Sequence, residues 1–308
     1  MSRRPAAYGA ALRRKSLIKK VLVGLVLLVV LSVLPLTYFG LLRGRDSNER
    51  RHVRVLFESG AFEGAYAQSK ELLINKPLDS FLLTVHGFSA YQLAIAQINT
   101  SDTLLYVDEC IWSLRKTMLS GDNSADGRVF YVLGKAYFYK GQEYADLAVK
   151  YLEKARSTYM ADDIPEYLGL AYASIRDFRG SVEAFSDALS MGQPADVLLL
   201  SIARSYIALD ENDSAKAYLH RCLEISVDSG SIAAAHLLLG NLYAKTGDFP
   251  GAEGEYLKAI EENGESAEIR YQLGELYASG GDTTRARAEW RRALRIDPTY
   301  GPARSRLN

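Results

Sequence analysis

The sequence predicts an all-α protein in which an array of about seven antiparallel helix pairs follows a single membrane-spanning helix. Two observations support this fold class. Small and aromatic residues recur about every 34 positions over most of the chain, which is the spacing of one helix pair. An apolar segment without any charge lies near the N-terminus.

Residues 1–20 form a basic tail, and the charge of the chain is divided along its length. Residues 1–54 contain 12 Lys and Arg against only Asp46 and Glu49, a net charge of +10. The whole chain has 37 basic and 37 acidic residues, so residues 55–308 hold 25 basic and 35 acidic ones, a net charge of −10. Because phosphate contacts need a basic face, this acidic array argues against binding nucleic acid.

Residues 21–42 are predicted to be a transmembrane helix. They include no charged residue, and about 22 residues at about 1.5 Å each span roughly 33 Å, enough to cross a hydrocarbon core of about 30 Å. One alternative is a cleaved signal peptide, whose apolar part usually covers only about 7–15 residues before a site of small residues. No such site follows Pro35. The other alternative is a buried helix of a soluble core.

The charges beside this segment bear on its orientation. Seven Lys and Arg precede it and five follow it within residues 43–54. Because the more basic flank tends to stay in the cytoplasm, we expect a cytoplasmic N-terminus and an array outside the cytoplasm, anchored in the inner membrane. The excess is small, so a cytoplasm-facing array stays open.

Two copies of the recurring pattern near the C-terminus are the clearest. Each has Leu-Gly and Tyr in a first helix, then Ala, a large residue and Ala in a second helix. Gly274 and Ala286 would let two antiparallel helices approach closely, and Trp290 would fill the space beside them. The positions in the last copy are Leu273, Gly274, Tyr277, Ala286, Trp290, Ala293 and Pro298, and those in the copy before it are Leu239, Gly240, Tyr243, Ala252, Tyr256 and Ala259.

Extending this register backwards divides residues 46–300 into helix pairs that become less regular towards the N-terminus. The third pair needs a small insertion near Gly141, the second is longer than the period, and the first lacks the Leu-Gly dipeptide. Irregular end copies are expected where an array meets solvent or lipid. The pairs are 46–79, 80–126, 127–161, 162–195, 196–232, 233–266 and 267–300, followed by a short C-terminal cap over 301–308 with Pro302 in its first turn.

These positions are those of the tetratricopeptide repeat, so residues 46–300 resemble the tetratricopeptide-repeat family. The resemblance implies an α-solenoid wound as a right-handed superhelix. Its leading helices would line a concave face, where partners in the family usually dock as extended peptides or helices. Chaperone-binding members hold a terminal carboxylate between Lys and Asn side chains, but here only Asn241 matches and Leu237 replaces the Lys. Recognition of chaperone tails is therefore not expected.

The remaining residues give no catalytic constellation. The sequence has no phosphate-binding Gly-rich loop, His-Glu-x-x-His, Gly-x-Ser-x-Gly or Cys-x-x-Cys motif. Its four histidines lie in different repeats without metal-ligand spacing. Cys110 and Cys222 lie in repeats too far apart for a disulfide and are expected to be buried thiols. We expect no enzymatic activity, no metal and no cofactor.

The candidate partner-binding residues lie on the leading helices. Their aromatic rings would supply contact area, and the charges of Arg128 and Lys135 would orient the ligand. This mixture suits a ligand that is both apolar and anionic. Alternatively, several of these rings pack between helices. The candidates are Phe88, Tyr91, Arg128, Tyr131, Lys135 and Phe138 in the second and third pairs, and Arg204 and Asn241 in later pairs.

These inferences predict a non-enzymatic scaffold, anchored in the lipid bilayer by residues 21–42, that binds a protein or peptide partner in a concave groove. With its array outside the cytoplasm, it would resemble single-pass repeat proteins of bacterial envelopes and support an envelope complex or exported proteins. The alternative is a cytoplasm-facing adaptor that recruits a soluble enzyme to the membrane. An enzyme with the array as an appendage is the third, disfavoured reading. The sequence does not indicate whether the array self-associates.

Overall fold

The computed structural model describes residues 47–97, 99–119, 126–192 and 195–307. The predicted basic tail and the predicted transmembrane helix over 21–42 lie outside the described residues. Among the residues that are described, no helix combines the length and the apolar character needed to cross a bilayer.

The described chain is entirely helical apart from its turns, and successive helices pair. Residues 47–58 are helical and are followed by α2, Phe62–Asn75. The further pairs are α3 (Ser80–Ala96) with α4 (Thr100–Leu119), α5 (Gly127–Lys140) with α6 (Ala145–Thr158), α7 (Ile164–Ser174) with α8 (Phe178–Ser190), α9 (Ala195–Ala208) with α10 (Asn212–Ile225), α11 (Ser229–Lys245) with α12 (Phe249–Glu262), and α13 (Ala267–Ser279) with α14 (Thr283–Ile296), before α15 (Gly301–Leu307).

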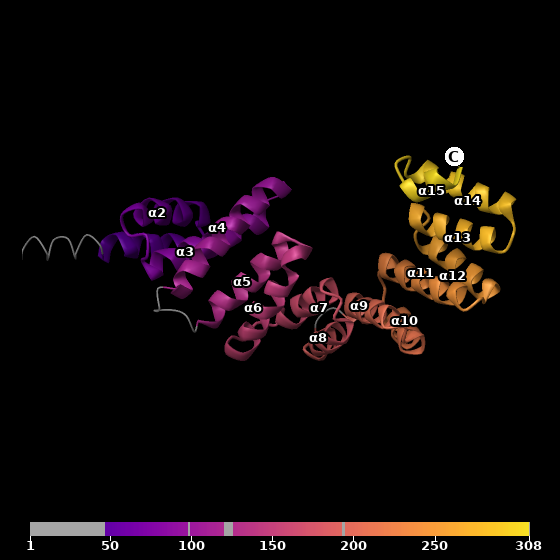
Figure 1. The fold of residues 1–308 in the computed structure, drawn as a ribbon, viewed down its shortest axis with the longest axis horizontal. Coiled ribbons are helices and arrows are strands. Elements are labelled where there is room, and N and C mark those ends of the chain that lie inside the picture. Colours follow the sequence, from indigo (N-terminus) through magenta and orange to yellow (C-terminus); the bar gives the residue numbers. More distant parts are fainter. Residues whose placement is uncertain (1–46, 98, 120–125, 193–194, 308) are drawn as a thin grey trace, which may run out of the picture.

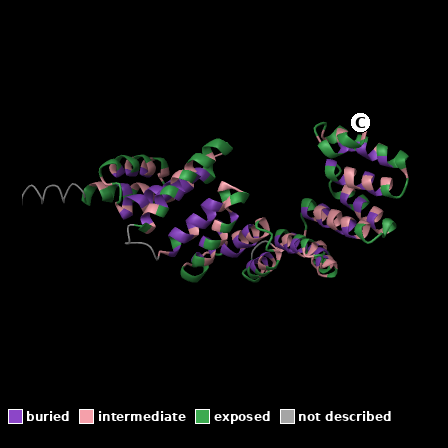
Figure 2. Cartoon of the chain, viewed as in Figure 1, coloured by how far each residue is buried: buried purple, intermediate pink, exposed green. Residues whose placement is uncertain are grey.

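The pairs stack in chain order into an extended, curved array (Figure 1). Contacts join consecutive helices, and leading helices also meet the next leading helix, as α3 meets α5 and α5 meets α7. Because the leading helices lie closer to one another, they form the inner side of the curve. Buried residues run along the faces that helices turn to each other, and exposed residues lie outside (Figure 2). The predicted all-α solenoid is confirmed.

The irregular positions of the register have local causes. The long second pair consists of longer helices, with 17 residues in α3 and 20 in α4. After Gly141, whose φ is 132°, a single 3-10 turn, η1 (Gln142–Tyr144), separates α5 from α6. Helix α11 begins at Ser229, before the predicted boundary at 233, because Asp228 caps it by accepting a hydrogen bond from the Ser231 amide at 2.7 Å.

Glycine makes the close approach between the two helices of each of the last two pairs. A Cβ atom on Gly274 would lie 2.6 Å from Trp290, and one on Gly240 would lie 2.6 Å from Tyr256. Both distances are far below van der Waals contact, so the aromatic ring of the second helix occupies the space that a side chain on the first helix would need. The predicted glycine–aromatic packing is confirmed at these two positions.

The turn inside each regular pair uses a left-handed residue. Arg176, Asp210, Gly247 and Gly281 have φ of 64°, 63°, 81° and 83° at equivalent positions. The next amide then bonds back to a tyrosine carbonyl of the first helix, as from Asp248 to Tyr243 at 2.9 Å, in the manner of a Schellman cap. The Asp248 carboxylate in turn accepts from the Gly251 amide at 3.0 Å and caps the second helix.

The buried core is continuous in one part of the array and divided in another. A single cluster of buried residues extends from Ala90 to Ala184, across α3 to α8. Beyond it the buried residues fall into smaller clusters, such as the one around Leu219 and the one around Tyr256. Cys110 and Cys222 are both buried thiols without a disulfide, as predicted. Burial raises the pKa of both, that of Cys222 to about 11, so neither is a reactive thiolate.

Candidate functional site

Aromatic residues of three consecutive leading helices meet on the inner side of the array. We call this group the tyrosine cluster; it consists of Tyr91 on α3, Tyr131, Lys135, Phe138 and Tyr139 on α5, and Asp163 and Tyr167 at the start of α7. The Tyr139 and Tyr167 hydroxyls are 3.0 Å apart, and the Phe138 ring stands edge-on to the Tyr167 ring at 5.4 Å between centroids. Four of the predicted residues, Tyr91, Tyr131, Lys135 and Phe138, therefore lie together.

Lys135 is the centre of the cluster, and only 8% of it is exposed. Its Nζ donates to Asp163 Oδ2 at 2.7 Å and to the Tyr131 hydroxyl at 3.0 Å. The same ammonium lies 4.2 Å from the centroid of the Tyr167 ring, a favourable cation–π distance. The rings and one carboxylate thus surround the positive charge of Lys135 and neutralise it inside the protein.

The ionisation of the cluster follows from this arrangement. Burial disfavours the charged lysine, but its hydrogen bonds to Asp163 and Tyr131 outweigh burial and raise the pKa of Lys135 above its usual value. Burial, with the nearby Asp163 carboxylate, raises the pKa of Tyr131 to about 12. Burial and the hydrogen bond with Tyr167 raise the pKa of Tyr139 to about 12. The cluster therefore presents neutral phenols and an internal ion pair at neutral pH.

The structure separates the two cations that were expected to act together. Arg128 is exposed at the start of α5 and bonds to Asp126, with Nη2 2.9 Å from Oδ2. Lys135 is buried against Asp163 instead. Since each cation has its own carboxylate, Lys135 does not present a free charge to a partner.

The other predicted residues lie elsewhere. Phe88 is partly buried and faces Phe57, with 6.3 Å between ring centroids. Arg204 is exposed on α9. Asn241 accepts a hydrogen bond from the Tyr256 hydroxyl at 2.7 Å, so its side-chain oxygen supports packing within the sixth pair. Their role in binding stays a prediction, and they do not join the tyrosine cluster.

Sequence reasoning missed Asp163 and Tyr167 as candidate site residues. Asp163 precedes the first residue of α7, so it reaches back to Lys135 from the next leading helix. The available signal was the position of Asp163 directly before α7, the leading helix that follows α5. Choosing between Tyr167 and its neighbours Glu166 and Leu170 needed the rotation of α7, which the repeat period alone does not fix.

What the cluster offers a partner is aromatic area and hydroxyl groups. Tyr139 is 39% exposed and marks the open edge of the cluster. Phenol rings bind apolar side chains with their faces and donate or accept hydrogen bonds at their tips, at little entropic cost because they have few rotatable bonds. This surface suits a peptide or helix with apolar side chains, and it needs no anion because Asp163 already balances Lys135.

A second concave site lies between α2 and α4, both of which pack on α3. It is a cavity of about 550 Å³ lined by apolar side chains such as Leu73, Ile74, Leu105 and Trp112 and by the charged groups of Lys70, Asp108 and Glu109, with His86 among the lining residues. Ile74 is 78% exposed, Leu105 59% and Trp112 50%. These values are high for large apolar side chains, so the rim of the cavity is an apolar surface.

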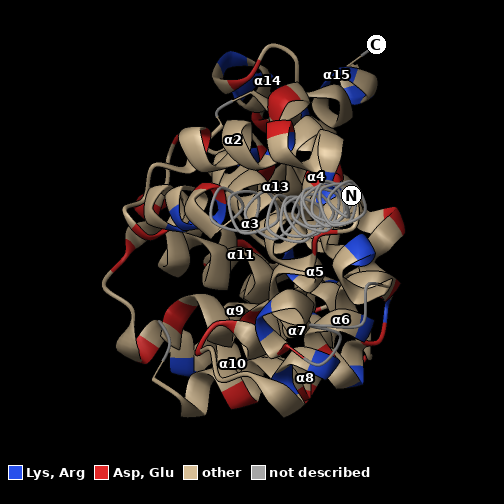
Figure 3. Ribbon diagram, turned by 90° about the vertical axis from the view of Figure 1, so that its left-hand side faces the viewer, with Lys and Arg blue, Asp and Glu red and all other residues tan. Residues whose placement is uncertain are grey.

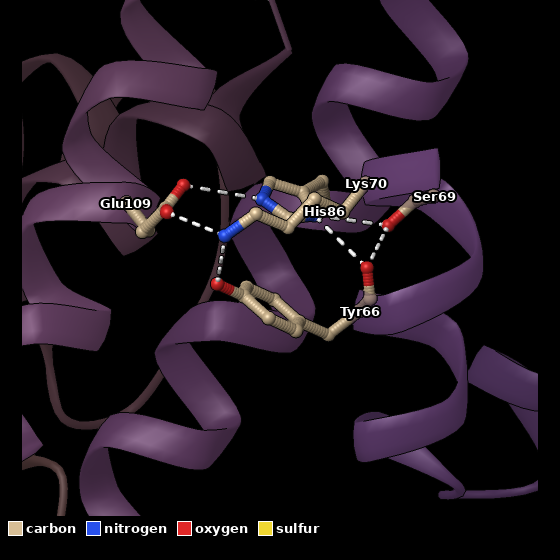
Figure 4. A network of polar contacts seen from close by, with 5 residues as sticks. All are labelled: Tyr66, Ser69, Lys70, His86 and Glu109. Carbon is tan, nitrogen blue, oxygen red and sulfur yellow. Dashed lines mark hydrogen bonds and ion pairs between the residues drawn. The ribbon is translucent and has the colours of Figure 1, made fainter. Parts of the chain in front are cut away.

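A polar network lies beneath this cavity (Figure 4). The His86 Nδ1 is 3.0 Å from the Ser69 hydroxyl, and its Nε2 is 3.4 Å from Glu109 Oε2. Lys70 bridges Glu109 Oε1 at 3.0 Å and the Tyr66 hydroxyl at 3.1 Å. Burial lowers the pKa of His86, against the opposing effect of Glu109. The network ties α2, α3 and α4 together around a buried imidazole that is neutral at neutral pH.

The order Ser69, His86, Glu109 is that of the groups in nucleophile–base–carboxylate sites, but its geometry does not fit such a site. Ser69 is fully buried, its hydroxyl also donates to the Tyr66 carbonyl at 2.9 Å, and it does not line the cavity. A nucleophile must reach a substrate atom, and Ser69 cannot. The network is structural.

Lys and Arg are interspersed with Asp and Glu over the helices rather than separated into faces of one sign (Figure 3). Within the described ranges, no group of three or more His, Cys, Asp and Glu side chains could hold a metal ion.

Comparison with known proteins supports the repeat assignment. Residues 200–267 and 237–301 match a sequence model of the tetratricopeptide repeat. No curated protein matches the chain significantly. The matched segments together cover the last three regular helix pairs and lie outside the tyrosine cluster.

Solved structures share the fold over most of the chain. The C-terminal part of a tetratricopeptide repeat-containing protein from Cytophaga hutchinsonii aligns with a TM-score of 0.59 and 18% identity over 84% of this chain and 99% of that one. PilW, described as a widely conserved type IV pilus biogenesis factor, aligns with a TM-score of 0.56 and 16% identity over 72% of this chain and 98% of that one. At these identities the likeness shows the fold alone.

Proposed function

We propose that the chain is a non-enzymatic scaffold that binds a protein partner on the inner side of its array. The proposal rests on the match to the tetratricopeptide repeat over residues 200–301 and on the solenoid fold of the described helices. The observation that supports this most directly is the tyrosine cluster. Its rings come from three separate leading helices, so they form a surface only because the repeats stack. A peptide or helix laid along that side would cross α3, α5 and α7.

The partner's chemistry follows from the exposed edge of the cluster. Tyr139 and Tyr167 offer ring faces and adjacent hydroxyls, while the lysine charge is already balanced. We infer a segment with one or two large apolar side chains beside backbone or side-chain hydrogen-bonding groups. Interface energy concentrates in such aromatic anchors, where truncation costs at least about 2 kcal/mol, roughly 30-fold in affinity.

Capture of partners by full-length protein in membranes, with crosslinking and identification of the captured chain, tests this proposal. We expect Tyr139→Ala with Tyr167→Ala to reduce capture of the main partner by roughly 30-fold. Tyr271→Ala is the matched control, because it removes a leading-helix tyrosine from the last pair and should leave capture unchanged. Equal losses in both variants, or none in the first, would contradict binding at the cluster. Reversing the charge of Lys135 is a poorer test, because it would leave Asp163 facing a second carboxylate.

The membrane arrangement is part of the proposal. We infer that residues 21–42 anchor the chain in the inner membrane with the array outside the cytoplasm, in support of an envelope complex or exported proteins. Its support is the apolar segment and the excess of basic residues before it. A reporter fused after Asn308 that is active only outside the cytoplasm tests the orientation. Activity of a cytoplasm-specific reporter would instead favour the adaptor that recruits a soluble enzyme to the membrane.

A further inference from the structure

The outer face of α4 has an apolar stripe that no part of the described array covers. Leu105, Trp112 and Leu119 are 59%, 50% and 86% exposed. They follow one another at seven-residue spacing, so they lie along one face of the helix over about 21 Å. Leu105 and Trp112 also line the cavity beside α2. Exposed apolar surface arranged in this way marks an interaction site, and its heptad spacing is that of a helix-to-helix seam.

The charges beside this stripe are arranged antisymmetrically about Trp112. Asp108 and Glu109 precede it by four and three residues, and Arg115 and Lys116 follow it by three and four. Asp108 and Arg115 lie on one flank of the stripe, and Glu109 and Lys116 on the other, because residues seven apart share a flank. Along α4, an apolar residue and an acidic pair precede Trp112, and a basic pair and an apolar residue follow it. The charge beside the stripe therefore changes sign at Trp112.

A helix with this pattern is complementary to itself in one orientation. If two copies of α4 pack face to face and antiparallel, with Trp112 at the two-fold axis, each flank meets the same flank of the other copy. Glu109 then lies opposite Lys116 of the second copy, and Asp108 lies opposite Arg115. Leu105 lies opposite Leu119, so the whole apolar stripe is covered.

The parallel orientation has the opposite electrostatics. There the flank with Glu109 meets the flank with Asp108 at nearly the same height, and Lys116 meets Arg115. Like charges placed in contact are destabilising, so the charge pattern selects the antiparallel pair. A two-fold axis also fits the geometry, because an isologous interface uses one patch that is complementary to itself.

We propose that the α4 stripe is a homodimer interface, in which the α4 helices of two copies of this chain pack antiparallel about Trp112. The cavity between α2 and α4 then receives side chains of the second copy's α4. In the single chain, Lys116 lies over the Trp112 ring at 3.8 Å and Asp108 bonds to Lys140 at 2.7 Å. On dimerisation Lys116 moves to Glu109 of the second copy, which also keeps its bond to Lys70, and Asp108 gains Arg115 beside Lys140.

Disulfide crosslinking of full-length protein in membranes tests the axis. Packed helices lie about 8–10 Å apart with Cα atoms about 2.3 Å from each axis, so residues facing each other at the seam have Cα atoms within disulfide reach. We expect Trp112→Cys to form a covalent dimer on mild oxidation. Two Leu105→Cys chains should not crosslink to each other, but a Leu105→Cys chain should crosslink to a Leu119→Cys chain when the two variants are mixed. Leu257→Cys on α12, 44% exposed, is the matched control and should stay monomeric.

Charge exchange tests the flanks without relying on cysteine. Asp108→Arg alone and Arg115→Asp alone should each weaken dimerisation, whereas an equal mixture of the two variants should restore it, because every contact in the mixed dimer again joins opposite charges. Trp112→Ala should weaken dimerisation by roughly 30-fold. Helicity and thermal melting of each variant show whether it is folded. A Leu105→Cys chain that crosslinks to itself, a mixture that stays monomeric, or a Trp112→Cys chain that crosslinks only to another protein would overturn the proposal.

Discussion

The two halves of the array use one architecture but different packing. From α3 to α8 a single cluster of buried residues, Ala90 to Ala184, runs through the helices, and the tyrosine cluster joins three leading helices on its inner side. From α9 onwards the core is divided into smaller units. The half from α9 onwards relies on contacts within each pair. The half from α3 to α8 has glycine contacts of the same kind and adds side chains that couple several pairs at once.

The largest expected effect tests the contacts within one pair of the half from α9 onwards. Tyr256 is 2% exposed and fills the space opposite Gly240. Tyr256→Ala should lower the free energy of unfolding of the C-terminal repeats by about 4 kcal/mol, because it leaves a cavity. Tyr256→Phe should cost only about 1 kcal/mol, since it removes one hydrogen bond with Asn241. Denaturant unfolding followed by hydrogen exchange in each repeat measures both. A loss spread equally over α3 to α8 would contradict a local core.

The next effect tests the coupling in the other half. Lys135→Met should cost about 3 kcal/mol, because it removes the cation that balances the partly buried Asp163 carboxylate. Replacing both partners, as Lys135→Met with Asp163→Leu, should recover most of this loss. Hydrogen exchange should show the effect of the single variant in both α5 and α7. Protection lost in α5 alone would show that the ion pair does not couple the two repeats.

The contrast between the halves also explains how far sequence analysis reached. Gly274, Trp290 and their equivalents obey a local rule of spacing, so the solenoid and its glycine–aromatic packing could be predicted from the chain. Tyr91, Tyr131, Lys135 and Phe138 were identified because they fall on inward positions of leading helices. That Lys135 is buried against Asp163 could not be predicted, because it depends on the rotation of α7 against α5. The hydrogen bond of Asn241 could not be predicted either, because its inward position in the sequence does not indicate that the Tyr256 hydroxyl donates to its side-chain oxygen.

A third effect concerns pH. Burial lowers the pKa of His86 in the folded state below its unfolded value of about 6.5, so the unfolded chain binds the proton more readily. The stabilisation from neutral His86 is therefore complete above about pH 6.5 and is lost as the pH falls from there. Glu109, whose pKa is also lowered, adds a further loss below about pH 4.5. Melting temperatures between pH 7.5 and 5 should fall for the native chain.

The control for this pH dependence is a histidine elsewhere. His86→Gln should flatten the fall between pH 7.5 and 5, whereas His220→Gln, at an exposed position on α10, should leave it unchanged. Should His86→Gln keep the full dependence, the titrating group would lie outside the network between α2 and α4.

The smallest effect tests the left-handed turns inside the pairs. Arg176 and Asp210 hold the left-handed position that Gly247 and Gly281 hold later in the chain. Arg176→Gly should raise stability by about 0.5 kcal/mol, because relief of the left-handed conformation slightly exceeds the entropy that glycine loses on folding. Gly247→Ala, where no atom lies near the added Cβ, should lower it by about 1 kcal/mol. Chemical denaturation measures both, and the same sign for both changes would contradict a purely conformational origin.

The stacking of repeats has a mechanical consequence. Because the main contacts of the described helices join chain neighbours or successive leading helices, a pull between the two ends loads the interfaces between them in series with one common tension. Under a common tension the weakest interface separates first. Extension would therefore begin between the repeats beyond α8, where the core is divided, while the continuous core from α3 to α8 stays intact. A partner held on the inner side of α3 to α7 would therefore stay bound while the repeats beyond α8 extend. The array would combine a stiff binding region with an extensible C-terminal part.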